Sequence, residues 1–413
     1  MAILTLGDVA TYINGRAFKP DEWEEEGLPI IRIQNLTNSS AVCNRTTKQF
    51  EDKYLVKDGD LLFAWSASLG AHIWHGEDGW LNQHIFKVVP NDNVDKMYLY
   101  YYLLQVVDQL YAKTHGSGMV HITLKPFKAT QIPIPSLNTQ KLIVERIESI
   151  FAKLDEAKEK AQAVVDGFEL RKSAILHKAF TGELTAQWRQ EHVADGEWLK
   201  TTLSKIVSGF KYGSSEKSDY SNTGMPVLRI PNIGEGIIDF SDLKFLTHDD
   251  VDEESQIHEN DLLIIRSNGS RDLVGKCAIV PKLEKPYAYA SFLIRIKPSK
   301  NIIPEYLSLY LNSSEARLQM FVKAKSSSGI HNINSKELGA ITISVPELIE
   351  QAEIVKTVNI LLEKELQAKD AAESVIDQID TMKKAVLARA FRGELGTNNP
   401  AEESAVELLK ELL

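Results

Sequence analysis

The sequence predicts an α/β (α+β) fold made of two tandem mixed blocks, with two long helices that pack as an antiparallel coiled coil. Three observations predict this fold. Segments of the first half recur in the second half, each copy contains a long heptad stripe of apolar residues, and short strand-like runs fill the rest. At 413 residues the chain is long enough for more than one hydrophobic core.

The internal repeat is visible in paired segments. "GLPIIRIQNL", which begins at Gly27, matches "GMPVLRIPNI", which begins at Gly224, at an offset of 197 residues. "AFTGEL" from Ala179 matches "AFRGEL" from Ala390 at an offset of 211 residues. The offset grows across the blocks and then stays at 211, so we expect loop insertions in the second block and a rigid element of fixed length after each block.

Each constant segment predicts a helix of roughly 40 residues, or about 60 Å. Pro135 and Pro346 lie just before the two segments, and Gly182 and Gly393 follow their ends. Apolar residues spaced alternately four and three positions apart form the heptad seam of a helix that packs on a partner helix. The predicted seam contains Ile143, Ile147, Ile150, Leu154, Ala157, Ala161, Val164 and Phe168 in the first copy, and Ile354, Val358, Leu361, Ala368, Ala372, Val375 and Ile379 in the second.

Two matched seams in one chain are most simply explained if the helices pack on each other. The alanines at the centre of each seam would let the helix axes approach closely, while Arg171 and Glu365 interrupt the two stripes. An approximate two-fold relation between the copies would make the helices antiparallel and place one block at each end. The alternative is a long amphipathic helix that lies on its own block.

The blocks are predicted to be mixed α/β. "PIIRI", "DLLFAW" and "HIFKVV" in the first block, and "DLLIIR", "KCAIV" and "FLIRIK" in the second, are typical of strands. Tyr98–Leu110 and Glu305–Phe321 are typical of helices. Their tyrosines are spaced like core residues, so we interpret them as core and not as a platform on which bases stack.

Composition favours a reduced, cytoplasmic protein. The sequence has no apolar run of membrane-spanning length and does not open with a secretory signal. Two cysteines, Cys43 and Cys277, cannot form a disulfide framework and do not have metal-ligand spacing.

The net charge of −10 argues at first against nucleic acid, but the charge is unevenly distributed. Residues 1–135 contain 12 Lys/Arg against 15 Asp/Glu, and residues 200–346 contain 18 against 17. The remaining 17 basic and 25 acidic residues belong to the other segments. Because the two blocks are nearly neutral, each can have a local basic face.

The sequence contains no recognisable catalytic, cofactor-binding or metal-binding motif. It lacks a G-x-x-x-x-G-K-[ST] phosphate loop, an H-E-x-x-H pair and a G-x-S-x-G elbow. It also lacks the (D/N)PPY-like tetrapeptide used by aminomethyltransferases. "SGFKYGSS", from Ser208, is a weak candidate for a phosphate cradle, because no clear helix start follows it.

Both blocks contain polar side chains suited to reading DNA, at corresponding places. Arginine and lysine bond guanine edges or phosphates, and asparagine bonds adenine edges. Taken singly, each such residue is more often a solvated loop residue. The candidates are Ser66, Ser68, His115, Ser117, His121 and Lys125 in the first block, and Arg266, Ser267, Asn268, Ser270, Arg271, Lys323, Lys325, Ser326, His331, Asn332 and Lys336 in the second.

A second set of polar residues is the same in both blocks. Arg32 and Asn35 in "RIQN" correspond to Arg229 and Asn232 in "RIPN". Residues that read different bases should differ between blocks, so we interpret these four as structural.

The chain resembles the specificity subunit of a type I restriction–modification system. The resemblance is carried by "IPIPSLNTQKLIVERIESIFAKLDE" from Ile132, by "LRKSAILHKAFTGELTAQWR" from Leu170, by their second copies and by the paired strands "PIIRIQNL" and "PVLRIPNI". It covers nearly the whole chain and is weakest in the candidate DNA-reading loops. "TAQWR" has no second copy, and the chain ends in a short amphipathic segment after Pro400.

This resemblance implies a division of the chain and a set of partners. The implied parts are target-recognition domain 1 (1–135), helical spacer 1 (136–182), a linker (183–199), target-recognition domain 2 (200–346), helical spacer 2 (347–393) and a tail (394–413). Each domain would read one half of a split, asymmetric site in double-stranded DNA. The helices would set the gap and hold two modification subunits, which methylate adenine at N6 after flipping the base.

The resemblance further implies that this chain is not itself an enzyme. Restriction and translocase subunits would complete the complex, and S-adenosylmethionine, ATP and Mg would bind to the partner subunits. Two alternatives stay open at this point. One is a coiled-coil adaptor with two protein-binding heads, and the other is a stand-alone nuclease or methyltransferase.

Overall fold

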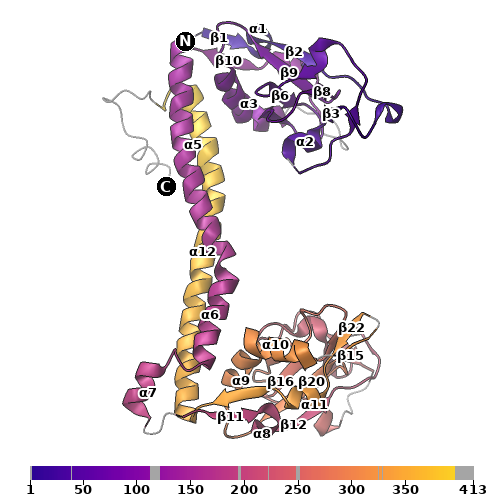
Figure 1. Cartoon of the computed structure of the whole chain (residues 1–413), viewed down its shortest axis with the longest axis vertical. Coiled ribbons are helices and arrows are strands. Elements are labelled where there is room, and N and C mark those ends of the chain that lie inside the picture. The colour runs from indigo at the N-terminus through magenta and orange to yellow at the C-terminus, as the bar shows by residue number, and fades with distance from the viewer. Residues whose placement is uncertain are drawn as a thin grey trace. The chain divides into compact units, whose positions relative to one another are not determined.

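The computed structural model describes residues 2–38, 40–111, 121–193, 197–221, 223–247, 252–323, 325–327 and 329–395. The chain divides into two compact units, one made of Met1–Gln162 with Glu373–Leu413 and the other of Ala163–Ala372. Each unit contains a globular block, called here the first head (residues 2–134) or the second head (residues 199–345), and a pair of helical segments (Figure 1).

The first head contains two four-stranded sheets. The order of the antiparallel sheet is β2 (Ala10–Asn14), β9 (Ile85–Pro90), β6 (Leu61–Ala64), β7 (Gly70–Ile73). The order of the second is β4 (Arg45–Thr46), β3 (Leu28–Ile31), β8 (Gly79–Leu81), β5 (Leu55–Val56). A short ladder joins β1 (Ala2–Thr5) to β10 (Gln131–Ile134). The helices are α1 (Leu6–Val9), α2 (Ile33–Thr37), α3 (Lys96–Tyr111) and α4 (Leu124–Lys128), with 3-10 turns at Pro20–Glu22 and Asp52–Tyr54.

The second head repeats this plan. Its antiparallel sheet runs β12 (Val207–Tyr212), β20 (Leu293–Pro298), β16 (Leu262–Ile265), β18 (Cys277–Ile279). Its other sheet runs β13 (Ser218–Asp219), β15 (Lys244–Leu246), β14 (Pro226–Leu228), β19 (Ala288–Tyr289). β11 (Leu199–Thr202) pairs with β23 (Thr342–Val345). The helices are α8 (Leu203–Ile206), α9 (Pro304–Leu311), α10 (Ser314–Lys323) and α11 (Ser335–Gly339), with 3-10 turns at Ile230–Asn232 and Glu253–Ser255.

The predicted repeat and strands are confirmed. The order β2-β9-β6-β7 in the first head corresponds to β12-β20-β16-β18 in the second. Each head also has one parallel pair, β3 with β8 and β14 with β19. Among the described residues, only the second head has a further three-stranded sheet, made of β17 (Ser267–Asn268), β22 (Ile330–Asn332) and β21 (Lys325–Ser327). It lies within the stretch where the offset between the copies grows.

The prediction of one helix over Glu305–Phe321 is wrong, because α9 and α10 are separate helices. α9 ends at Leu311, and Asn312 caps it. The Asn312 side chain accepts a bond from the Cys277 backbone N–H (3.1 Å) and donates to the Cys277 carbonyl (2.8 Å), so that it acts as an extra partner for strand β18. This tie to the sheet favours a turn over another helical turn.

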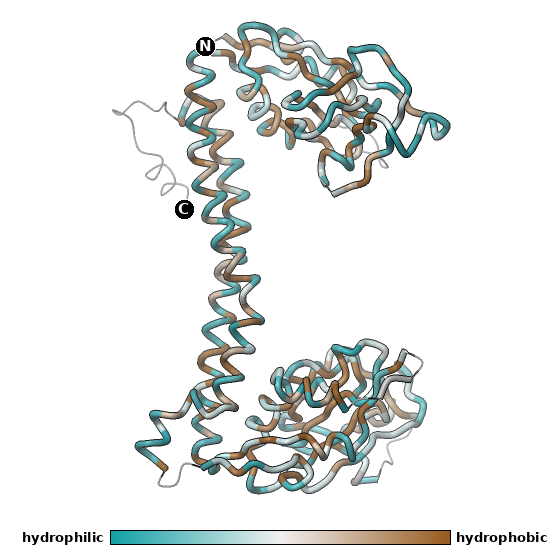
Figure 2. Tube along the Cα trace, in the orientation of Figure 1, coloured by the Kyte–Doolittle hydropathy of each residue, from teal (hydrophilic) through white to brown (hydrophobic). Residues whose placement is uncertain are grey.

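In the first unit, α5 (Leu137–Asp166) lies antiparallel to the C-terminal part of α12 (Leu348–Arg392). Lys158 pairs with Asp380 (2.7 Å) and Asp155 with Lys383 (2.5 Å), so residue numbers rise along one helix as they fall along the other. In Figure 2, hydrophobic residues recur along these helices between hydrophilic ones. The predicted antiparallel pairing is confirmed.

In the second unit, α6 (Phe168–Phe180) pairs with the N-terminal part of α12 through the two residues that interrupt the seam. Arg171 Nε lies 2.6 Å from Glu365 Oε2, and Arg171 Nη2 donates to the Val164 carbonyl at 2.9 Å. The first helix is not continuous as predicted, because it is interrupted at Gly167. A Cβ at residue 167 would clash with the Arg171 guanidinium, so glycine makes room for the ion pair.

The predicted seam is buried over most of its length but not at every position. Ile147, Ile150, Ile354 and Val358 have no exposed surface. The other buried positions are Ile143, Leu154, Ala161, Ala372 and Ile379, and Leu361, Val164 and Phe168 are half-buried. Ala157, Ala368 and Val375 are exposed, contrary to the prediction. A straight helix rotates by about 20° per heptad relative to the 3.5-residue repeat. Residues at strict heptad positions therefore turn away from the partner helix after a few heptads.

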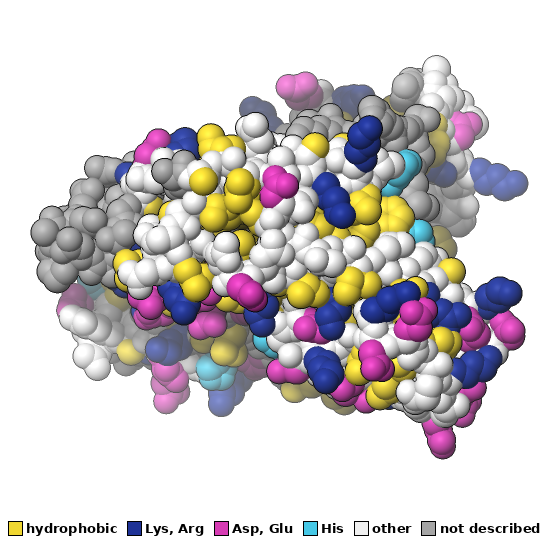
Figure 3. All heavy atoms as spheres, turned by 90° about the horizontal axis from the view of Figure 1, so that it is seen from above, with side chains coloured by type: hydrophobic (Ala, Val, Ile, Leu, Met, Phe, Trp, Pro, Cys, Tyr) yellow, Lys and Arg dark blue, Asp and Glu magenta, His cyan; other side chains and the backbone are white. Residues whose placement is uncertain are grey.

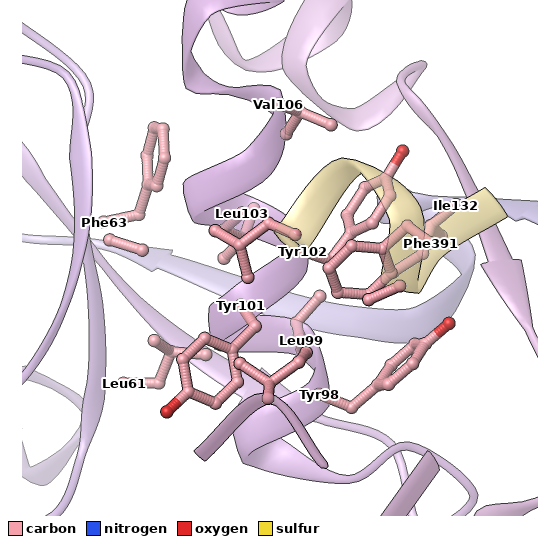
Figure 4. Packing of buried hydrophobic residues seen from close by; sticks show 14 of the residues in the cluster. Leu61, Phe63, Tyr98, Leu99, Tyr101, Tyr102, Leu103, Val106, Ile132 and Phe391 are labelled. Atoms are coloured by element: carbon pink, nitrogen blue, oxygen red, sulfur yellow. The ribbon is translucent and has the colours of Figure 1, made fainter. Parts of the chain in front are cut away.

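The repeated "AF-x-GEL" corner docks the end of a helix on a head. Phe391, at the end of α12, packs edge-on against Tyr98 and Tyr102 of α3, with ring centroids 5.1 and 5.0 Å apart (Figure 4). Phe180, at the end of α6, packs in the same way against Tyr306 and Tyr310, at 5.3 and 5.1 Å. Burial raises the pKa of Tyr102 to about 12, so this phenol stays neutral. The prediction that these tyrosines form core is confirmed.

A buried glutamine ties each long helix to its own head. Gln140 accepts a bond from the Asp95 N–H (2.8 Å) and donates to the carbonyls of Asn93 and Pro135 (both 3.0 Å). Gln351, 211 residues later, is the corresponding residue, and both side chains have no exposed surface. Its partners are the Ile303 N–H (2.8 Å) and the carbonyls of Asn301 (3.2 Å) and Pro346 (2.9 Å).

The "TAQWR" segment, which has no second copy, forms α7 (Ala186–His192) and surrounds a buried carboxylate. Glu350, 1% exposed, accepts bonds from Thr185 Oγ1 (2.7 Å), Arg189 Nε (2.7 Å) and Trp198 Nε1 (3.1 Å). The residue that corresponds to Glu350 in the first copy is Thr139, which has no carboxylate to satisfy. The "TAQWR" segment thus occurs once, and only Glu350, not Thr139, has a buried carboxylate that needs these hydrogen bonds.

Candidate nucleic-acid interface

The additional sheet of the second head brings together candidate residues that are far apart in the sequence. In its register, Ser267 lies opposite Asn332, and Asn268 opposite His331. β21 then places Lys325 opposite Asn332 and Ser326 opposite His331. Four of these residues pair across strands although their sequence positions differ by more than 60. Strand pairing thus gathers four of the candidate residues on one small sheet.

Arg266 is held beside this sheet by two contacts. Its Nε donates to Asn332 Oδ1 at 3.3 Å, and its guanidinium lies 4.6 Å from the ring centroid of Tyr212. An arginine held by a stack and an amide is pre-oriented for a planar partner such as a guanine edge or a phosphate. Tyr212, which the sequence prediction did not include, is 42% exposed and therefore contributes to this surface.

Arg271 and Ser270 follow in the turn after β17. The Ser270 backbone N–H donates to Asn268 Oδ1 (2.7 Å), which closes an Asx turn. The Arg271 guanidinium lies 4.6 Å from the ring centroid of Phe321 in α10, and the Arg317 guanidinium lies 5.3 Å from the same centroid. Lys323 ends α10, and Lys336 is exposed in α11.

In the first head the structure supports fewer candidates. Ser66 forms a single β-bridge with His121, at the place of the larger sheet in the second head. Ser66 is only 4% exposed, so its side chain is not available to a ligand at the surface. Ser68, His121 and Lys125 are exposed. The predicted candidates His115 and Ser117 lie outside the described residues.

The "RIQN" and "RIPN" asparagines are structural, as interpreted from the sequence. Asn35 Oδ1 accepts from the Arg32 N–H (3.0 Å), and Asn232 Oδ1 accepts from the Arg229 N–H (2.8 Å). Both asparagines are buried, and their amide groups donate to carbonyls of the following loop. Arg229 also pairs with Asp242 at 3.0 Å.

A basic cavity of about 540 Å³ in the second head was not found from the sequence. Lys211 and Arg295 lie opposite each other on β12 and β20, and Lys297 lies two residues further on the same face. His258 and Glu253 complete the wall. The signal was the alternation of basic and apolar residues in "FKYG" and "LIRIKP", which becomes a cluster only when the two strands pair.

The surface shows mixed charge where it is seen from above. In Figure 3, Lys and Arg side chains are interspersed with Asp and Glu, and no extended region of one sign covers this face. Within the described ranges there is no group of three or more His, Cys, Asp or Glu that could hold a metal ion. Cys277 is buried, which raises the pKa of its thiol, and Cys43 is also a free thiol. No helix in the described part of the chain is long and apolar enough to cross a membrane.

The fold and this surface define a class of protein: a duplicated α/β scaffold that presents different polar side chains at corresponding places. The model of the type I restriction modification DNA specificity domain matches residues 1–165 and 199–373. The chain therefore belongs to the family of type I restriction–modification DNA specificity subunits.

Relatives with known roles agree with this assignment. The chain is 27% identical to the EcoKI specificity subunit of Escherichia coli K12, over 99% of this chain and 94% of that protein. It is 25% identical to the EcoBI specificity subunit of Escherichia coli, over 99% and 91% of the two chains. The fold is similar to that of the HsdS subunit from Thermoanaerobacter tengcongensis, with a TM-score of 0.60 at 17% identity over 95% of this chain and 97% of that one. A chain from a solved type I R-M system gives a TM-score of 0.69 at 18% identity, over 95% and 98%.

Proposed function

We propose that each head of this specificity subunit reads one half of a bipartite, asymmetric site in double-stranded DNA. The observation that carries the proposal is a common scaffold with different side chains at corresponding positions. Trp65 follows β6, and the corresponding residue after β16 is Arg266, although the strands around them pair in the same order. Two readers of different sequences need this combination, because phosphate contacts position a protein and side chains at base edges specify the sequence.

The paired helices are proposed to set the gap between the half-sites and to hold two modification subunits. The buried glutamines Gln140 and Gln351 and the docked rings Phe180 and Phe391 support a rigid attachment of helix to head. A rigid attachment matters because each wrong base pair costs only about 1–3 kcal/mol, and both half-sites must be engaged together for these penalties to add.

The chemistry is proposed to belong to the partner subunits. In this proposal the chain is not an enzyme and binds no cofactor. The modification subunits use S-adenosylmethionine to methylate adenine at N6, and restriction subunits use ATP and Mg for translocation and cleavage. The complex acts on DNA in the cytoplasm.

Methylome sequencing of a host that expresses the chain with its modification subunits tests this function. The expected result is methylated adenine in a two-part motif with a gap of fixed length. A continuous motif, or no methylation although the partners are active with another specificity subunit, would contradict the proposal. An adaptor with two protein-binding heads would give no motif of its own, and the family assignment already favours DNA recognition over that alternative.

A further inference from the structure

The two heads contain a corresponding cavity beside the candidate interface. In the first head a cavity of about 250 Å³ is lined by Arg32, Gln83 and His84. In the second head a cavity of about 310 Å³ is lined by Arg229, Ser291 and Phe292. Neither cavity was found from the sequence, because its walls come from segments about 50 residues apart or more.

The backbone around both cavities is the same. Arg16 and Asn82 form a parallel bridge in the first head, and Ser214 and Ala290 form one in the second. The Arg16 N–H donates to the Leu81 carbonyl (3.0 Å), as the Ser214 N–H does to the Tyr289 carbonyl (2.8 Å). Residues 83 and 84 therefore correspond to residues 291 and 292.

The arginine wall is also shared. The Arg32 guanidinium lies 5.8 Å from the Trp23 ring centroid, and the Arg229 guanidinium lies 5.7 Å from that of Tyr220. The buried asparagine described above fixes the backbone of each arginine. A wall that is the same in both heads cannot distinguish two different DNA sequences.

The opposite wall differs in chemistry. In the first head the Gln83 amide and the His84 ring can both donate and accept hydrogen bonds. Gln83 Oε1 and His84 Nδ1 have no hydrogen-bond partner in the described part of the chain, while Gln83 Nε2 lies 3.3 Å from His84 Nε2. Buried polar atoms without a partner are costly in the free protein, and a polar ligand that reaches them removes this cost. In the second head the wall consists of a hydroxyl and a phenyl ring, and Phe292 is 56% exposed.

Backbone hydrogen bonds connect this variable wall to the candidate interface. The Trp65 N–H donates to the His84 carbonyl (3.1 Å), and the two rings lie 5.3 Å apart. In the second head the Arg266 N–H donates to the Phe292 carbonyl (2.9 Å). Arg266 is the residue that lies beside the β17–β22–β21 sheet, so the backbone of Phe292 is adjacent to the candidate interface.

We propose that Gln83 and His84 in the first head, and Ser291 and Phe292 in the second, are specificity-determining residues that contact base edges. Gln83 and His84 hydrogen-bond a purine edge in the major groove, where adenine and guanine each present acceptors at N7 and a second polar group at position 6. Phe292 makes the apolar contact that favours the methyl group of thymine, with Ser291 bonding the adjacent base. This inference rests on the proposed reading of one half-site by each head.

The test is the methylome of a host that expresses the full chain with its modification subunits. The double variant Gln83→Ala/His84→Ala is expected to make one or two positions of one half-site degenerate, and Phe292→Ala to do so in the other half-site. Discrimination at those positions should fall about tenfold or more, which corresponds to about 1.4 kcal/mol. The gap and the untouched half-site should not change.

The control substitutions are Asn138→Ala and Gln367→Ala, at exposed positions of the long helices outside the heads. Both variants should keep the wild-type motif. If a variant gives no methylation, its binding to duplexes that contain the wild-type site or one single-base substitution is measured by titration, with a thermal melt to check folding. A reduced ratio between the two affinities supports the inference. A folded variant with an unchanged ratio overturns the inference. This includes a variant whose affinity falls by the same factor for every sequence, which is the result expected for a phosphate contact. If the wild-type chain itself gives no two-part motif, the proposed function fails and not this inference alone.

Discussion

At the scale of residues, corresponding side chains in the two copies pack the end of each helix against a head. Phe391 and Phe180 are 7% and 5% exposed, and each inserts between two tyrosines whose hydroxyls donate to backbone carbonyls of the neighbouring strand. Tyr98 Oη bonds the Pro133 carbonyl and Tyr306 Oη the Ser344 carbonyl, both at 2.8 Å. The "AF-x-GEL" repeat therefore has a packing role, since its phenylalanine docks on a pair of tyrosines in each head.

Truncating these rings should loosen one unit at a time. Phe391→Ala should destabilise the packing of α3, and Phe180→Ala that of α9, by about 3–5 kcal/mol, as for other buried phenylalanines. Hydrogen exchange followed by mass spectrometry measures the opening free energy of each helix separately. Phe391→Leu is the control and should cost much less, because it keeps most of the buried volume. Equal loosening of α3 and α9 by Phe391→Ala would contradict the assignment.

At the scale of elements, the two charged interruptions of the heptad stripes form one interaction. Arg171 and Glu365 meet at 2.6 Å, with side chains 36% and 25% exposed, so the pair is partly screened by water. Such a pair adds little to stability, but a polar pair in an apolar seam can fix which residues face each other. Gly167 supports the same ion pair, because the Cβ of any larger residue would displace the Arg171 guanidinium.

Gly167→Ala should therefore have an effect that depends on Arg171. Gly167 has an αR backbone that alanine can adopt, so the substitution should stabilise by about 0.4–1 kcal/mol when Arg171 is first replaced by alanine. In the wild-type background the new Cβ displaces Arg171 from Glu365, so the gain should be lost or reversed. A double-mutant cycle measured by urea unfolding gives the coupling energy. Equal stabilisation in both backgrounds would show that Gly167 does not serve the ion pair.

At the scale of the whole molecule, the antiparallel register of the helix pair decides which deletions are compatible with folding. In the first unit, residue 155 lies opposite 383 and residue 158 opposite 380. Residues 155–161 and 377–383 are therefore matched heptads. Their joint removal keeps the apolar stripes aligned, while removal of either one alone shifts one stripe against the other.

Removing both heptads should change the gap of the recognised motif and not its half-sites. Seven helical residues correspond to about 10.5 Å, or about three base pairs at about 3.4 Å each. Methylome sequencing of the deletion variant should show no methylation at the original spacing, with either a new gap or no site. The control is the substitution Lys153→Ala in the undeleted chain. Lys153 is exposed on α5, so this variant should keep the original motif. Methylation that persists at the original spacing would disprove the role of the helices in setting the gap.

The sequence by itself determined the duplication, three strands in each head and the heptad pattern of the long helices. Repeated segments and apolar periodicity are local patterns, and each can be read without knowing what lies opposite. The family assignment also followed from such segments, and the comparison confirmed it. The burial of Tyr98, Tyr102, Tyr306 and Tyr310 was predictable for the same reason, because their spacing matches one face of a helix.

Only the tertiary structure decided how separate segments meet. It paired Arg171 with Glu365, which are 194 residues apart, and it explained two apparent defects of the seam as one contact. It gathered Lys211, Arg295 and Lys297 into a basic cavity, and it placed Gln83 and His84 opposite Arg32. It also buried Ser66 and exposed Ala157 and Ala368, contrary to the sequence prediction. The physical reason is that cross-strand register and helix drift depend on the packing partner, and no local pattern specifies that partner.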